Sequence, residues 1–192
     1  MDTPSTAAPA QTHSGPLNAA LLAGVVLVAA IFAFNSIYLS NWYAVFKTVH
    51  VLLAVVWVGG GVLLTILAVL TDRRSDPHEV ATIARQAVFV GEKIFAPAGL
   101  VVFLMGVAMM LNTNWGWGKF WVVAGLIGYA ATFVNGLAVL TPQAKRVSRL
   151  LDEKGAEAPE TQAAIARILL IARIDVAVLL LVVVDMVTKP FS

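Results

Sequence analysis

The sequence WYAVFKTVHVLLAVVWVGGGVLLTILAVL, at residues 42–70, decides the structural class of this protein. A helix rises about 1.5 Å per residue, so about 20 apolar residues cross the roughly 30 Å of hydrocarbon in a bilayer. This stretch is longer than that, and Lys47 is its only Lys, Arg, Asp or Glu residue. It therefore predicts a transmembrane helix.

Four further apolar runs have the length of a membrane span: residues 17–39, 94–111, 120–140 and about 168–187. They are expected to be helical, because a bilayer interior offers no partner to open backbone groups and the alternation of a barrel strand is missing. The sequence thus predicts an all-α polytopic membrane protein, a bundle of five transmembrane helices over residues 17–192. Residues 1–16 are small, polar and contain proline, which predicts a disordered tail.

The composition supports the membrane assignment and excludes other classes. Hydrophobic residues make up 59% of the 192 and charged residues 12%, whereas an ordinary soluble domain has roughly 25% charged residues. The 13 Lys and Arg nearly balance the 11 Asp and Glu, and there is no Cys. A soluble fold, a nucleic-acid binder and a disulfide scaffold are therefore not expected, and the lipid bilayer is the expected partner.

The distribution of basic residues predicts the orientation in the membrane. They gather between the second and third spans and between the fourth and fifth, whereas the connections at residues 40–41 and 112–118 have none. By the positive-inside rule, the basic connections are cytoplasmic. This predicts a multi-pass inner-membrane protein with its N-terminus inside and its C-terminus outside. Aromatic residues of an interface belt fall at the opposite, outer level: Tyr38, Trp42, Tyr43, Trp115, Trp117 and Trp121.

Both basic connections carry helix signals. Pro77, with Glu79 at the third helical position, indicates a helix that leads into the third span. Residues 142–154 predict an extension of the fourth span that ends at Gly155, and Pro159 opens the fifth helix. These extensions on the cytoplasmic side either lie along the membrane surface or continue the spans into solvent.

Ionisable side chains inside a bilayer are costly, so each is a candidate functional group. His50 is the only His within a span, and Asp185 falls at about the same depth, roughly 10 Å outside the bilayer centre. Neutral imidazole is a ligand for haem iron or copper, and we expect Asp185 to orient it through the other ring nitrogen. Lys47 and Trp57 share a helical stripe with His50, and Gly59–Gly61 leave room on it for a close helix or a flat ligand.

Thioether sulfurs lie at the same outer level, on Met105, Met109 and Met110. Such sulfur suits Cu(I), or a second axial position on haem iron. The alternative is structural, because an interfacial His anchors a helix end and Met fills gaps between helices.

A second polar level, formed by Asn135, Arg173 and Asp175, lies roughly 5–8 Å on the cytoplasmic side of the centre. Arg173 and Asp175 are two residues apart, so they point to nearly opposite faces of their helix. We expect Arg173 to reach Glu92 or the surface, and Asp175 to meet Asn135 or another helix. This structural polar cluster is expected to lock the bundle, with a proton or substrate path as the alternative.

Two resemblances bear on function. The second span, FKTVHVLLAVVWVGGGVLL with His50 and Trp57, resembles a helix of CopD-like copper-resistance proteins and of HemJ-type protoporphyrinogen oxidases. From about Trp42 to Phe191, including EKIFAPAGLVVFLMGVAMM and VDMVTKPF, the chain resembles a family of predicted bacterial integral membrane proteins of unassigned function. The HemJ resemblance implies haem b held by His50, and the CopD resemblance implies copper handling near the outer face.

Three functional expectations follow. The first is haem b bound through His50 in the outer half of the second span. The second is copper handling or transport through His50 and the methionines, and the third is an accessory or scaffold protein without a cofactor. The sequence has no catalytic triad, zinc-protease motif or phosphate-binding loop that would indicate an enzyme class. The small-residue faces in AALLAG and VGGG are compatible with a homo- or hetero-oligomer.

Overall fold

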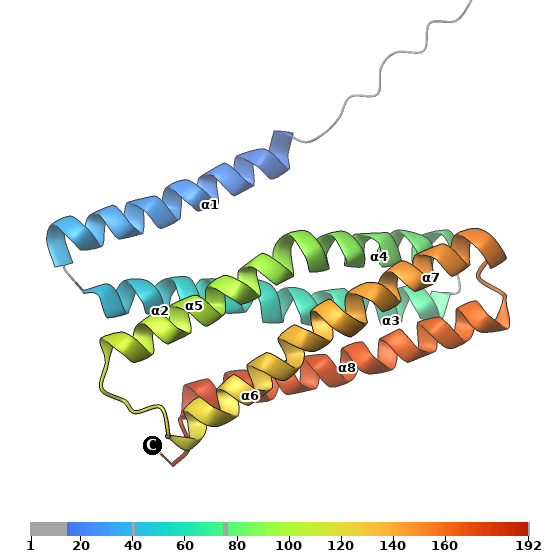
Figure 1. Cartoon of the computed structure of the whole chain (residues 1–192). Helices are drawn as coiled ribbons and strands as arrows, with labels where there is room; N and C mark the ends of the chain where they lie inside the picture. Colours follow the sequence, from blue (N-terminus) through green and yellow to red (C-terminus); the bar gives the residue numbers. More distant parts are fainter. Residues whose placement is uncertain (1–14, 40, 75–76, 192) are drawn as a thin grey trace, which may run out of the picture. The chain divides into compact units, whose positions relative to one another are not determined.

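The computed structural model describes residues 15–39, 41–74 and 77–191, and every regular element in them is helical (Figure 1). This confirms the predicted all-α polytopic fold. The chain divides between Val45 and Phe46 into two compact units, which are described one at a time. The predicted N-terminal tail, residues 1–16, lies outside the described residues except for its last two, with which the first helix begins.

The first unit contains three elements: α1 (Gly15–Phe34), the π-helical turn η1 (Asn35–Leu39) and the start of α2 (Trp42–Ala54). Asn35 closes the turn between the helices. It is only 2% exposed, and its Oδ1 accepts a hydrogen bond from the N–H of Asn41 at 2.8 Å. The ring of Phe32 packs against Trp42, with centroids 5.8 Å apart.

In the described part of the second unit, the helices form long rods. Three rods consist of two α-helices joined by a π-helical turn: α2 with η2 (Val55–Gly59) and α3 (Gly60–Arg74), α4 (Pro77–Val90) with η3 (Gly91–Phe95) and α5 (Ala96–Asn112), and α6 (Phe120–Asn135) with η4 (Gly136–Leu140) and α7 (Thr141–Lys154). The last rod is α8 (Pro159–Thr188). The first three are long and apolar enough to cross a membrane, at 33, 34 and 35 residues.

Proline explains two of the π-helical turns. Pro97 and Pro142 each follow two residues after the end of η3 and η4. A proline has no N–H to donate, and its ring collides with the carbonyl four residues earlier. The wider turn just before it lets the helix continue after this break in the hydrogen-bond ladder. In the rod formed by α2 and α3, the π-helical turn η2 is followed by Gly60 and Gly61 and not by a proline.

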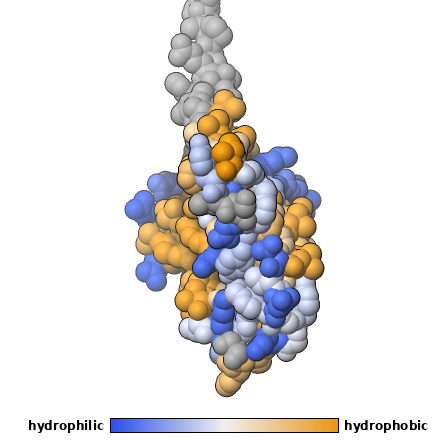
Figure 2. Space-filling view, turned by 90° about the vertical axis from the view of Figure 1, so that its left-hand side faces the viewer, coloured by the Kyte–Doolittle hydropathy of each residue, from blue (hydrophilic) through white to orange (hydrophobic). Residues whose placement is uncertain are grey.

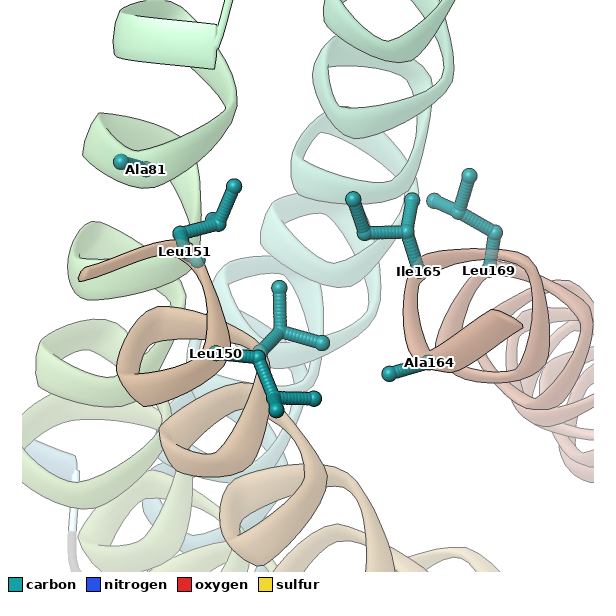
Figure 3. Packing of buried hydrophobic residues seen from close by; sticks show 8 residues of the cluster. Ala81, Leu150, Leu151, Ala164, Ile165 and Leu169 are labelled. Atoms are coloured by element: carbon teal, nitrogen blue, oxygen red, sulfur yellow. The ribbon is translucent and has the colours of Figure 1, made fainter. Parts of the chain in front are cut away.

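One end of the rods has its own apolar core, built by α4, α7 and α8. Side chains from the three helices point toward one another (Figure 3). The buried members are Ala81, Ala84, Val147, Leu150, Leu151, Ala164, Ile165 and Leu169. We call this the basic end, because it carries the basic residues of both connections. The opposite end, near Trp115 and Trp121, is called the tryptophan end.

Ion pairs surround the core of the basic end. Arg85 on α4 lies 3.6 Å from Asp152 on α7, and Lys154 pairs with Glu160 across the turn into α8. Gly155, with φ 78°, occupies a left-handed position that ends α7 as predicted. The extensions therefore continue the spans as a packed bundle, which decides between the two arrangements left open by the sequence.

The sides of the rods are apolar and uncovered. Leu111, Ile127 and Leu181 are 74%, 66% and 67% exposed. Figure 2 shows hydrophobic side chains on the surface at both sides of an end-on view. A soluble protein rarely exposes so much apolar area, whereas lipid chains cover such a surface at no cost.

Candidate functional site

His50 lies on α2 and faces α5. Its Nδ1 donates a hydrogen bond to the backbone carbonyl of Val102 at 2.7 Å, and a Cβ on Gly106 would come within 3.3 Å of its Cε1. A carbonyl oxygen only accepts hydrogen bonds, so Nδ1 carries the proton and Nε2 of the neutral ring keeps a lone pair. The imidazole is therefore fixed in orientation, with Nε2 left as an acceptor.

Asp185 does not supply the predicted contact to His50. Among the described residues, no hydrogen bond joins the two side chains, and the Val102 carbonyl orients the ring in place of the carboxylate. Asp185 faces α6, where a Cβ on Gly125 would lie 3.4 Å from its Oδ2. That oxygen is buried without a hydrogen-bond partner. The imidazole and the carboxylate thus face different helices, α5 and α6.

Lys189 follows α8 in a left-handed conformation, with φ 46°, and its N–H donates to the carbonyl of Asp185 at 2.8 Å. Its Nζ lies 3.7 Å from the ring centroid of Trp115 and 5.0 Å from that of Trp121. These cation–π contacts hold the ammonium, and no side-chain ion pair between Lys189 and Asp185 is found in the described structure. Desolvation by burial, together with the charge of exposed Lys47, lowers the pKa of Lys189.

The methionines of the predicted metal site lie on α5. Met110 is buried in a small apolar cluster with Trp121, whereas Met105 and Met109 are half-buried. No group of three or more His, Asp or Glu side chains is placed to hold a metal ion in the part of the chain that the structure describes. The structure gives Met110 a packing role, and copper ligation with His50 stays a prediction.

The residues predicted at the second polar level, together with Glu92, form two contacts in the structure. Asn135 on α6 donates from Nδ2 to Oδ1 of Asp175 on α8 at 2.7 Å, which confirms the predicted pair. Glu92 pairs with Lys145 on α7 at 2.5 Å, and no ion pair between Glu92 and Arg173 is found among the described residues. Arg173 is exposed at the surface of the bundle. Asp175 is therefore left with an amide and not a cation as its partner.

Trp57, on η2, enters a cluster of aromatic rings. It meets Tyr129 and Phe133 edge-on, with centroids 5.7 and 6.1 Å away, and Tyr129 stacks between Phe133 and Phe103. The Tyr129 hydroxyl donates to the carbonyl of Gly99 at 3.2 Å. The sequence indicated Trp57 but not its partners Tyr129 and Phe133. The i, i+4 spacing of Tyr129 and Phe133 on one helix face is the signal that indicates them.

A cavity of about 170 Å³ lies beside Trp57 and Phe133 and extends between the rods toward the basic end. Its wall is mostly apolar, and the charged residues among the described lining residues are Asp72 on α3 and Asp175 on α8. Four threonines add hydroxyl groups: Thr65, Thr71, Thr132 and Thr141. The sequence indicated Trp57 and Asp175 but not Asp72 or the threonines. The depth of a residue along its helix does not tell which face of that helix meets a neighbouring helix.

Three of the π-helical turns, η2, η3 and η4, contribute to the wall of this cavity. Trp57 comes from η2, Gly91 and Phe95 from η3, and Gly136 from η4, and all four line the wall. The ring of Phe95 lies against Gly60, where a Cβ would come within 2.7 Å of it. A flat group does rest on the glycine stripe, as the sequence allowed, but it is a side chain of this protein.

A family model described as "Predicted integral membrane protein (DUF2269)" matches residues 44–190, which is most of the chain. The chain belongs to this DUF2269 family. The match confirms the predicted resemblance to a membrane family of unassigned function. No curated protein and no solved structure matches the chain.

Within the DUF2269 match lie both polar levels, the aromatic cluster and the whole cavity wall, whereas α1 lies outside it. The matched residues nearly coincide with the second structural unit, which starts at Phe46. The candidate site therefore belongs to the DUF2269 part of the chain. The resemblance to CopD-like and HemJ-type proteins stays a prediction for this DUF2269 protein.

Proposed function

We propose that this DUF2269 protein is a multi-pass inner-membrane protein that binds a small, largely apolar molecule in the cavity between its rods, as part of its transport or handling. The observation that carries the proposal is the position of Asp175, an ionisable side chain in the wall of an apolar cavity. Ligand sites are typically apolar concavities with a few convergent polar groups. An ionisable residue at membrane depth marks such a site more often than a packing position.

The backbone around the cavity supports this proposal. π-helical turns are rare and occur frequently at functional sites, and three of them contribute to this wall. A bundle that only needed to pack would gain by filling this volume, because empty space between helices forfeits dispersion contacts. The cavity and the irregular turns together favour binding over the scaffold alternative.

The proposed orientation places the basic end in the cytoplasm and the tryptophan end outside. Lys and Arg are concentrated at the basic end, in the connections after α3 and α7, whereas Trp115, Trp117 and Trp121 lie at the other. This is the asymmetry of the positive-inside rule combined with an aromatic belt. Under this proposal the N-terminus is cytoplasmic and the C-terminus is outside.

Photolabelling in liposomes tests the binding function, with phenyl(trifluoromethyl)diazirine as the probe and peptide mass spectrometry to locate the labels. We expect labels on Trp57 and Phe133 of the wild-type protein. Gly136→Leu fills open space in the cavity wall and should abolish them. Gly59→Leu is the matched control, because Gly59 also has open space around it but lies outside the wall. Labels confined to lipid-facing residues such as Leu181 would refute the proposal.

A specific observation favours haem b as a second candidate function. The Val102 carbonyl fixes His50 with Nε2 as an acceptor, which is how proteins commonly orient a histidine that binds a metal. His50 would hold the iron from one side, and haem would supply one-electron chemistry. The cavity wall does not include His50, so this site is separate from the first. A visible spectrum after expression with sufficient haem tests it: a Soret band absent from His50→Ala supports ligation, and its absence from the wild type refutes it.

A further inference from the structure

We infer that the molecule bound in this cavity is an amphipathic cation, with its positive charge at Asp175 and its apolar body against the aromatic and aliphatic wall. The inference rests on the proposed binding function and specifies its ligand class. It depends on three features of the cavity: the sign of charge on its wall, the hydrogen bonding of Asp175 and the aromatic rings of the wall.

The charge of the wall has one sign. Among the described residues of the wall, Asp72 and Asp175 are the charged ones, and none is Lys, Arg or His. Basic residues are numerous at this end of the rods, but those with ion-pair partners in the described structure face other carboxylates, as Lys145 faces Glu92. An anion in this cavity would have no cationic partner. A cation would have a carboxyl group as its partner.

The two oxygens of Asp175 differ in their hydrogen bonding. Its Oδ1 accepts the hydrogen bond from Asn135, whereas no described residue donates to its Oδ2. A carboxylate offers several acceptor positions, and a charged group in an apolar site is costly unless it is paired. An ammonium group at Oδ2 supplies the missing partner. Asn135 donates to the same carboxylate and would hold it in place for that contact.

The aromatic rings of the cavity wall suit the same ligand. Trp57, Phe95 and Phe133 line the cavity, and aromatic faces attract organic cations through their quadrupole. Aliphatic side chains complete the wall, among them Leu64, Leu137, Val176 and Leu179. A molecule with one cationic group and an apolar body matches both parts. A divalent metal ion does not, since no group of three or more metal-binding side chains occurs in the described residues.

A pair of photoprobes of nearly equal shape tests the ligand class. One is benzyltrimethylammonium with a trifluoromethyl diazirine on the ring, and the other is its neopentyl analogue, in which carbon replaces the nitrogen. The full-length protein is reconstituted in phosphatidylcholine vesicles, which carry no net charge. The concentration for half-maximal labelling of Trp57 and Phe133 is then measured for each probe.

We expect the cation to label the cavity at a concentration at least about tenfold below that of the neutral probe, the size expected for a contact with a charged group. Asp175→Asn should remove this preference while keeping the shape of the side chain. Asp185→Asn is the matched control, because the same substitution on the same helix lies outside the wall. It should leave the preference unchanged.

The other outcomes separate the two proposals. Equal labelling of the cavity by both probes refutes the cation inference and leaves the binding function standing. Labelling of the cavity by neither probe refutes the binding function itself. If Asp175→Asn does not fold, Asp72→Asn and the wild-type ratio of the two probes still decide the question, because a ratio near one overturns the inference.

Discussion

Gly128 on α6 lies so close to Val182 on α8 that a methyl group on the glycine would overlap Cγ2 of the valine. Gly125, one turn earlier, faces Met186 in the same way. Glycines at these two positions let the helix backbones approach closely, as is typical of helix pairs in membranes. The contact sets the spacing of the two helices that carry Asn135 and Asp175.

Gly128→Ala should therefore destabilise the protein, by about 1–3 kcal/mol, because the added methyl forces a side chain or a helix to move. Gly59→Ala is the control, since no atom lies near its added Cβ, and it should stabilise the helix by roughly 0.5–1 kcal/mol. Thermal unfolding in detergent measures both. Equal midpoints for the two variants would contradict the close approach.

Removal of the amide partner of Asp175 should also be costly. Asn135→Ala leaves the carboxyl group without its hydrogen bond, for an expected loss of about 1–3 kcal/mol. A double-mutant cycle with Asp175→Ala separates the pair from its surroundings, and residues in direct contact couple by roughly 0.5–3 kcal/mol. Additive effects of the two substitutions would show that the hydrogen bond contributes nothing to stability.

The sequence was sufficient to predict the helices and much of their ends. Apolar runs of span length locate the rods, and Pro77, Gly155 and Pro159 mark boundaries that the structure confirms. These signals are local, because they depend on the length of a run or on the backbone chemistry of one residue. The π-helical turns were not predicted, although Pro97 and Pro142 indicate two of them in retrospect.

The candidate site was predicted less well, for a physical reason. Depth along a helix follows from residue number, so His50 and Asp185 were assigned to one level and expected to meet, whereas the structure turns them toward different helices. Which face of a helix meets which neighbour depends on packing, as Gly125 and Gly106 illustrate. The pair of Asn135 and Asp175 was predicted because few polar groups exist at that depth to satisfy one another.

The turn between α7 and α8 should respond to pH. A hydrogen bond from Lys154, together with its charge, lowers the pKa of Glu160 below the ordinary value. A lowered carboxyl pKa stabilises the fold above the ordinary value, and the contribution is lost as pH falls through the lowered value. Glu160→Gln should thus reduce the melting temperature at pH 7, and this difference should shrink as the pH falls through the lowered pKa of Glu160. The difference should vanish at every pH in a Lys154→Gln background, and its persistence there would assign it to another partner.

The orientation is open to direct labelling, because the chain has no Cys that would interfere. Asn114 and Glu153 are exposed at the tryptophan end and the basic end. The cells are used with the inner membrane intact and any outer barrier removed. A membrane-impermeant maleimide should then modify Asn114→Cys, and it should reach Glu153→Cys only after permeabilisation. The reverse order of labelling would place the basic end outside.

The rods are longer than a bilayer is thick. At about 1.5 Å per residue, rods of 33 to 35 residues measure roughly 50 Å, against about 30 Å of hydrocarbon. Charged residues gather at the basic end, so this is the end suited to project beyond the hydrocarbon. Asp72 lies nearer this projecting end than Trp57 does, so under the proposed binding function a cationic ligand would pass Asp72 before it reaches Asp175.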